Sequence, residues 1–111
     1  MSSHPTNPNE SQPRPLQGVR VLDFTSMMAG PYATRYLADL GAEVIKVEPA
    51  EGDYIRQRLP LRDGYSAYFS HLNAGKRSIV LDLKHPAGIE AARALAAKAD
   101  VLVEAFRPGV M

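Results

Sequence analysis

From residue 18 onward, short apolar runs rich in β-branched side chains alternate with segments in which apolar residues recur every three or four positions. The runs at 19–24 and 43–48 predict buried strands. Between them, Pro31 suits the first turn of a helix and Gly41 suits its end. Four apolar residues share one face of that expected helix: Ala33, Tyr36, Leu37 and Leu40. This part of the pattern predicts two parallel strands joined by a helix in a right-handed unit.

The second half of the chain repeats this order after an interruption. Prolines, glycines and charges are scattered through 49–64, which predicts a long ordered loop rather than a strand or a helix. A short helix is expected at 65–72 and a strand at 77–83. Pro86 again suits a helix start, and a strand is expected at 101–103. The helix between them has an apolar stripe: Ile89, Ala92, Leu95, Ala96 and Ala99. The order βαβ, long loop, βαβ predicts an α/β fold with a parallel sheet.

The two ends of the chain differ from this pattern. Residues 1–15 hold four of the nine prolines and almost no aliphatic side chains, which predicts a disordered N-terminal lead. A folded domain is expected over 16–111. The sequence stops at 107–111, within the loop that would lead to a next helix, so we expect this domain to be truncated.

Composition narrows the possible functions. The 111 residues carry 13 Lys and Arg against 12 Asp and Glu, interleaved along the chain, which gives no basic surface for nucleic acid. The chain has no cysteine and three scattered histidines, which argues against disulfides, thiolate metal sites and a metal function. No apolar stretch approaches the ~18 residues of a membrane span, and the polar opening lacks the apolar centre of a signal peptide. We therefore expect a cytoplasmic protein without membrane or nucleic-acid partners.

Candidate ligand contacts follow the strands, because ligands of open parallel sheets bind outside the carboxyl ends of the strands. The loop at 25–30 combines small residues with a helix N-terminus, but its single glycine matches no phosphate-binding motif, so a tight structural turn is favoured over an anion contact. Glu48 ends the second strand, where a dinucleotide fold places a ribose-binding acid, but the glycines of that fold are missing. Lys84 could reach a phosphate, whereas Lys76 is interpreted as a solvated residue at a strand start.

The other polar and flexible residues receive structural interpretations. Met27 and Met28 are interpreted as flexible core filler. His71 and His85 are assigned to the surface, without an identifiable partner. The six aspartates are assigned to strand-flanking, helical or loop roles: Asp39 pairs with Arg35 four residues earlier, and Asp82 and Asp100 are expected in turns or caps.

Five phrases taken together resemble the family III CoA-transferases, which include formyl-CoA transferases, carnitine CoA-transferases and α-methylacyl-CoA racemases. They cover about residues 15–111 in the family's order, at 15–24, 29–31, 40–49, 73–84 and 100–109. The resemblance implies a Rossmann-like large domain, of which this chain is the N-terminal part. It also implies acyl-CoA and carboxylic acid substrates, CoA that is not covalently bound, and an interlocked homodimer in a longer parent.

The resemblance also implies individual contacts with CoA. The loop of Ser26, Met27, Met28 and Ala29 would contact the thiol arm, Leu81 and Lys84 the adenine and phosphate end, and Phe106 the middle. Ala105 stands where the family usually has Asn, which removes one side-chain hydrogen bond near the cofactor. In the family an aspartate attacks the acyl-CoA carbonyl. That nucleophile is expected downstream of Met111, so no catalytic residue is assigned.

Two alternatives remain open at this point. The racemase branch of the same family would use an acid–base pair that also lies downstream. A nucleotide-binding or interaction module without catalysis is the alternative from another class.

Overall fold

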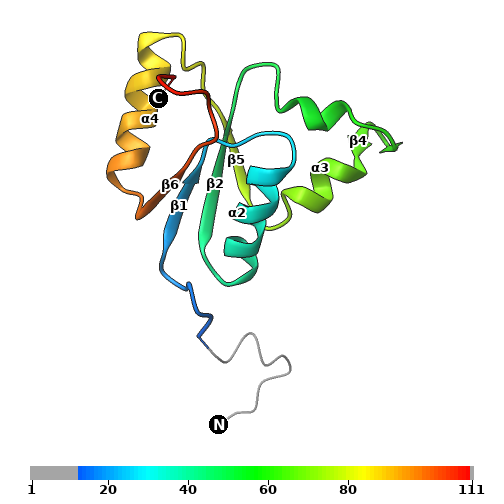
Figure 1. The fold of residues 1–111 in the computed structure, drawn as a ribbon, viewed down its shortest axis with the longest axis horizontal. Coiled ribbons are helices and arrows are strands. Elements are labelled where there is room, and N and C mark those ends of the chain that lie inside the picture. The colour runs from blue at the N-terminus through cyan, green and yellow to red at the C-terminus, as the bar shows by residue number, and fades with distance from the viewer. Residues whose placement is uncertain (1–12, 111) are drawn as a thin grey trace.

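The computed structural model describes residues 13–110, so most of the predicted disordered lead lies outside the described residues. The described part contains a four-stranded sheet, a two-stranded hairpin and four helical segments (Figure 1). In chain order the elements are β1 (Arg20–Asp23), α2 (Ala29–Asp39), β2 (Glu43–Glu48), the 3-10 helix η1 (Tyr54–Gln57), β3 (Leu61–Arg62), β4 (Tyr65–Ser66), α3 (Ala67–Leu72), β5 (Arg77–Val80), α4 (Pro86–Ala97) and β6 (Val101–Val103).

The main sheet is fully parallel, with the strand order β5-β2-β1-β6. The central strand β1 places Val21 beside Val44 of β2 and beside Val101 of β6. This confirms the predicted α/β fold, and the outward growth of the sheet from β1 and β2 is the Rossmann-like arrangement that was expected. None of the helices in the described part is long and apolar enough to cross a membrane.

Helices α2 and α4 cover opposite faces of the sheet (Figure 1). Val21 of β1 packs with Ala38 of α2 in one apolar cluster, whereas the next residue, Leu22, packs with Ala92 of α4 in another. This division follows from the alternation of side chains along a strand. The apolar stripe predicted for α4 is largely confirmed, although Ile89 remains 39% exposed.

The apolar face predicted for α2 is wrong for most of its residues, since of the four only Leu37 packs against an apolar cluster. Tyr36 is 52% exposed and Leu40 is 44% exposed, while the buried residues of this helix are Pro31, Thr34 and Ala38. The helix is rotated because the Thr34 hydroxyl donates a hydrogen bond of 2.7 Å to the buried Asp23 carboxylate. The predicted end of the helix holds, since Gly41 follows it with a left-handed φ of 106°.

The segment 49–64 was predicted as a long ordered loop, but it contains regular secondary structure. It contains η1, and its end forms the hairpin of β3 and β4. Asp63 and Gly64 both have positive φ, 52° and 83°, as a two-residue hairpin turn of this type requires. The Asp-Gly pair was therefore the signal that could have identified the hairpin.

Candidate functional site

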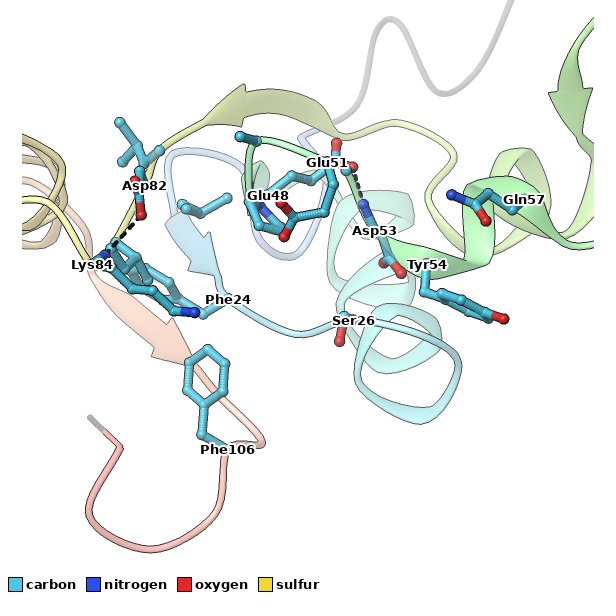
Figure 2. A pocket seen from close by; sticks show the side chains of 16 residues that line it. Phe24, Ser26, Glu48, Glu51, Asp53, Tyr54, Gln57, Asp82, Lys84 and Phe106 are labelled. Carbon is cyan, nitrogen blue, oxygen red and sulfur yellow. Dashed lines mark hydrogen bonds between the residues drawn. The ribbon is translucent and has the colours of Figure 1, made fainter.

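A cavity of about 620 Å³ lies at the carboxyl ends of the parallel strands (Figure 2). Segments that follow all four strands of the main sheet line it: Phe24 and Ser26 after β1, residues 49–54 after β2, residues 81–84 after β5, and Phe106 after β6. The cavity thus occupies the edge at which the strand order predicted a ligand site. In Figure 2, Lys84 and Phe106 stand at one end and Tyr54 and Gln57 at the other.

The structure brings together half of the residues that were predicted to contact a cofactor. Four of them line the cavity: Ser26, Leu81, Lys84 and Phe106. The other four adjoin it in the chain without lining it: Met27, Met28, Ala29 and Ala105. The two methionines are 38% and 44% exposed, so their interpretation as core filler is wrong.

The carboxylate of Glu48, which lines the cavity, is bound by several donors of the protein itself. It accepts two hydrogen bonds of 2.7 Å from the Arg56 guanidinium, one of 2.8 Å from the Asp53 backbone N–H, and one from the Ser78 hydroxyl. Burial raises the pKa of this carboxyl, but the Arg56 and Ser78 hydrogen bonds outweigh it and lower the pKa to about 2. Glu48 is therefore occupied by the protein itself, which disagrees with a free ribose-binding acid.

A buried ion pair joins β2 to the loop that follows it. The Lys46 ammonium lies 2.8 Å from the Asp53 carboxylate, and each side chain is 1% exposed. Lys46 also donates a hydrogen bond of 2.9 Å to the backbone carbonyl of Thr25. The Asp53 carboxylate accepts from the N–H of Ile55, which caps η1, and from the N–H of Met27.

A second buried pair, Asp23 with Lys76, was not predicted. The Lys76 ammonium lies 3.0 Å from the Asp23 carboxylate, and the two side chains are 1% and 0% exposed. Burial raises the pKa of Asp23, but hydrogen bonds from Thr25 and Thr34 and the charge of Lys76 outweigh it, so the pKa is lowered. Burial also lowers the pKa of Lys76, against the opposing effect of Asp23. The interpretation of Lys76 as a solvated residue is therefore wrong.

The remaining polar predictions have mixed outcomes. Arg35 and Asp39 form the predicted pair at 3.5 Å, and the Asp82 carboxylate accepts a turn hydrogen bond from the Lys84 N–H. Both histidines do have partners. His71 Nδ1 lies 3.0 Å from the Arg35 guanidinium, and His85 caps α4 by accepting from the Ala87 N–H.

The cavity combines apolar surface with one cation, and its lining also holds the carboxylates of Glu51 and Asp82. Phe24, Leu81 and Phe106 supply apolar surface, and Lys84 supplies a cation. The carboxylates of Glu48 and Asp53 are engaged by Arg56 and Lys46. Within residues 13–110, no group of three or more acidic or histidine side chains is placed to hold a metal ion.

Comparisons with known proteins agree with this geometry. A model of the family described as CoA-transferase family III matches residues 16–111. The formyl-CoA:oxalate CoA-transferase of Rhodopseudomonas palustris is 54% identical over 100 residues, which cover 86% of this chain and 23% of that protein. The succinyl-CoA:glutarate CoA-transferase of Mus musculus is 49% identical over 98 residues, which cover 86% of this chain and 22% of that protein.

A solved structure has the same fold. The crystal structure of a CAIB/BAIF family protein from Brucella suis matches with a TM-score of 0.83 at 44% identity, over 88% of this chain and 27% of that one. The chain thus spans about a quarter of the length of the relatives that it matches. Since the family model covers nearly the whole described sheet and the cavity at its edge, the chain belongs to CoA-transferase family III.

Proposed function

We propose that this chain is the CoA-binding part of an acyl-CoA:carboxylate CoA-transferase. The observation that carries the proposal is the cavity at the carboxyl ends of the four strands, in a chain whose relatives are named as CoA-transferases. An acyl-CoA has anionic phosphates joined through a long arm to a thioester. A cavity with an apolar wall and a lysine at one end fits such a ligand.

The proposed contacts divide along the cavity. Lys84 and Leu81 hold the phosphate and adenine end of CoA, and Phe106 packs against the middle. The loop from Ser26 to Ala29 faces the pantetheine arm and the thiol. Ala105 offers no side-chain hydrogen bond, so in this proposal the neighbouring contact comes from the Phe106 ring alone.

Acyl exchange requires a carboxylate that attacks the thioester carbonyl and expels the CoA thiolate, which gives a mixed anhydride. In the cavity, Glu48 is held in a bidentate pair with Arg56, and Asp53 is held by Lys46. A carboxylate that is held in this way is a poor nucleophile. The proposal assigns no catalytic residue to this chain and, following the family resemblance, places the nucleophilic aspartate in a segment beyond residue 111.

The same proposal includes a carboxylic acid as acceptor, a homodimeric parent protein and a cytoplasmic location. Large side chains exposed along one edge of the sheet support the dimer, since Val101 and Leu102 of β6 are each 41% exposed.

The test is a titration of the chain with CoA, followed by amide chemical shifts in NMR spectra. We expect a dissociation constant in the millimolar range, about 4 kcal/mol of binding free energy, with shifts at the loops that line the cavity. Lys84→Met should weaken binding about threefold, which is the size expected for one exposed charge contact. Lys98→Met removes an exposed lysine at the end of α4, away from the cavity, and should leave binding unchanged. Shifts confined to surfaces outside the cavity, or no shifts, would refute the proposal.

A further inference from the structure

The loop between β1 and α2 is held at two points by one buried ion pair. Lys46, from the middle of β2, donates to the Thr25 carbonyl at 2.9 Å. Its partner Asp53 accepts from the Met27 N–H, with both carboxylate oxygens 3.2 Å from that nitrogen. Ser26, which lines the cavity, lies between these two points. The backbone on each side of Ser26 is therefore fixed by one member of the pair.

The conformation of this loop needs such support. Met27 has a φ of 68°, in the left-handed region that a side chain with a Cβ rarely adopts. A residue in this region keeps its conformation only where its surroundings determine it. Met27 is 38% exposed and belongs to neither apolar cluster of the sheet. The Asp53 carboxylate is the partner that the structure shows for the Met27 N–H.

Asp53 also organises the opposite wall of the cavity. Its carboxylate accepts from the Ile55 N–H at 3.0 Å and so begins η1. Its own N–H donates to Glu48 at 2.8 Å. The segment from Pro49 to Tyr54, which lines that wall, is thus attached to the same carboxylate as Met27. One buried side chain relates the two walls to each other.

We propose that Lys46 and Asp53 are positioning residues that preform the cavity by holding the Ser26–Ala29 loop against the segment after β2. The proposal rests on the proposed function for its ligand, which is CoA. Both side chains are 1% exposed, so they act through the backbone that they hold and not by direct contact. Loss of the pair lets the loop leave its left-handed conformation, and CoA then has to restore that conformation when it binds.

The first experiment uses the wild-type chain and needs no substitution. Amide hydrogen exchange of Met27, measured by NMR, should be at least about tenfold slower than in an unstructured peptide of the same sequence. Because the Asp53 carboxylate accepts from the Met27 N–H, such protection reports that hydrogen bond. Exchange at the peptide rate would refute the proposal that Asp53 holds this loop, whatever the variants below do.

The second experiment compares Asp53→Asn with Lys76→Met. The first replaces the carboxylate with an amide of the same shape, whose single acceptor oxygen cannot serve Lys46, the Met27 N–H and the Ile55 N–H together. The second removes the lysine of the equally buried pair with Asp23. Lys76 touches neither Ser26 nor Met27, and Asp23, which accepts from the Thr25 N–H, is left in place. Asp53→Asn should speed Met27 exchange and weaken CoA binding, each by about tenfold more than the control, as expected for the loss of one buried hydrogen-bonded contact. Equal effects of the two variants would make the pair a stability element only.

A rescue variant separates positioning from stability. Because Met27 belongs to the loop that is proposed to face CoA, Asp53→Asn is compared in two backgrounds, the wild type and Met27→Gly. Glycine removes the left-handed penalty, so Asp53→Asn should cost less CoA affinity in Met27→Gly than in the wild type. Equal costs in the two backgrounds would contradict the proposal. If the spectrum of the wild-type chain does not respond to CoA, the proposed function is refuted. The positioning role of Lys46 and Asp53 is then decided by the Met27 exchange rates alone.

Discussion

Thr34→Val should destabilise the protein more than its small change in shape suggests. The Thr34 side chain is buried at 1% exposure, and its hydroxyl donates at 2.7 Å to the Asp23 carboxylate, which is fully buried. Valine keeps the volume and removes the donor. A hydrogen bond to a charged group contributes about 1.5–3 kcal/mol. For a domain of this size, that loss corresponds to a melting temperature lower by roughly 6–24 °C.

The matched control is Thr34→Ser, which keeps the hydroxyl and removes one methyl group, worth about 1 kcal/mol. Urea unfolding followed by far-UV circular dichroism gives both free energies, provided that the slopes agree. We expect the valine variant to lose more stability than the serine variant. A valine variant as stable as the serine variant, or more stable, would show that the hydroxyl does not stabilise the buried carboxylate.

The pH dependence gives a second check on the same substitution. The pKa of Asp23 is lowered in the folded protein from its ordinary value of 3.8, so its contribution to stability is present above that pH and is lost as the pH falls below it. Without the Thr34 donor, Asp23 takes up its proton at a higher pH. The difference between wild type and Thr34→Val should therefore shrink in acid. A difference that grows there would contradict the assignment.

Three further outcomes are expected. Glu48 has a pKa of about 2 in the folded protein against an ordinary 4.5, so urea unfolding should show stability falling as the pH is lowered between these values, and Glu48→Gln should remove this part of the dependence. Gly88→Ala should cost about 1–3 kcal/mol in thermal unfolding, because its Cβ would lie 1.9 Å from the Asp82 carbonyl oxygen. Ile55→Ala should cost about 2–5 kcal/mol by the same assay, because Ile55 is fully buried beside the cavity wall.

The sheet was predictable because its signals are local. Short apolar runs marked all four strands, and the alternating order of strands and helices indicated a parallel sheet. Pro86 marked the start of α4 and is its first residue. The hairpin was equally local, but the Asp63-Gly64 turn was overlooked among the charges around it.

Only the position of the site, at the edge of the sheet where the strands end, was predictable. The rule for parallel sheets placed the ligand at the strand ends, and the family resemblance added residues such as Lys84 and Phe106 that do line the cavity. The polar contacts behind that edge were not predictable. Lys76 binds a carboxylate 53 positions earlier in the sequence, and no pattern of spacing indicates such a partner. The buried face of α2 was predicted wrongly for the same reason, because it depends on the hydrogen bond from Thr34 to Asp23.

One signal for these contacts was nevertheless present in the sequence. Lys46 stands inside an apolar run, and a lysine within a buried strand requires a partner. Asp23 and Lys46 are paired neighbours in the register of β1 and β2, so two opposite charges lie side by side at the ligand end of the sheet. Each is nevertheless bound to another charge, Lys76 and Asp53 respectively.

The arrangement of these pairs separates what stabilises the fold from what shapes its edge. Apolar residues of similar volume often replace a buried ion pair without loss of stability, so the two apolar clusters on the faces of the sheet are the more direct source of stability. An apolar residue at Lys46 or Asp53, however, could not hold the Thr25 carbonyl or the Met27 N–H. The charges lie where backbone must be fixed beside the cavity, and that requirement explains why the polar positions depart from the binary pattern at this end of the sheet.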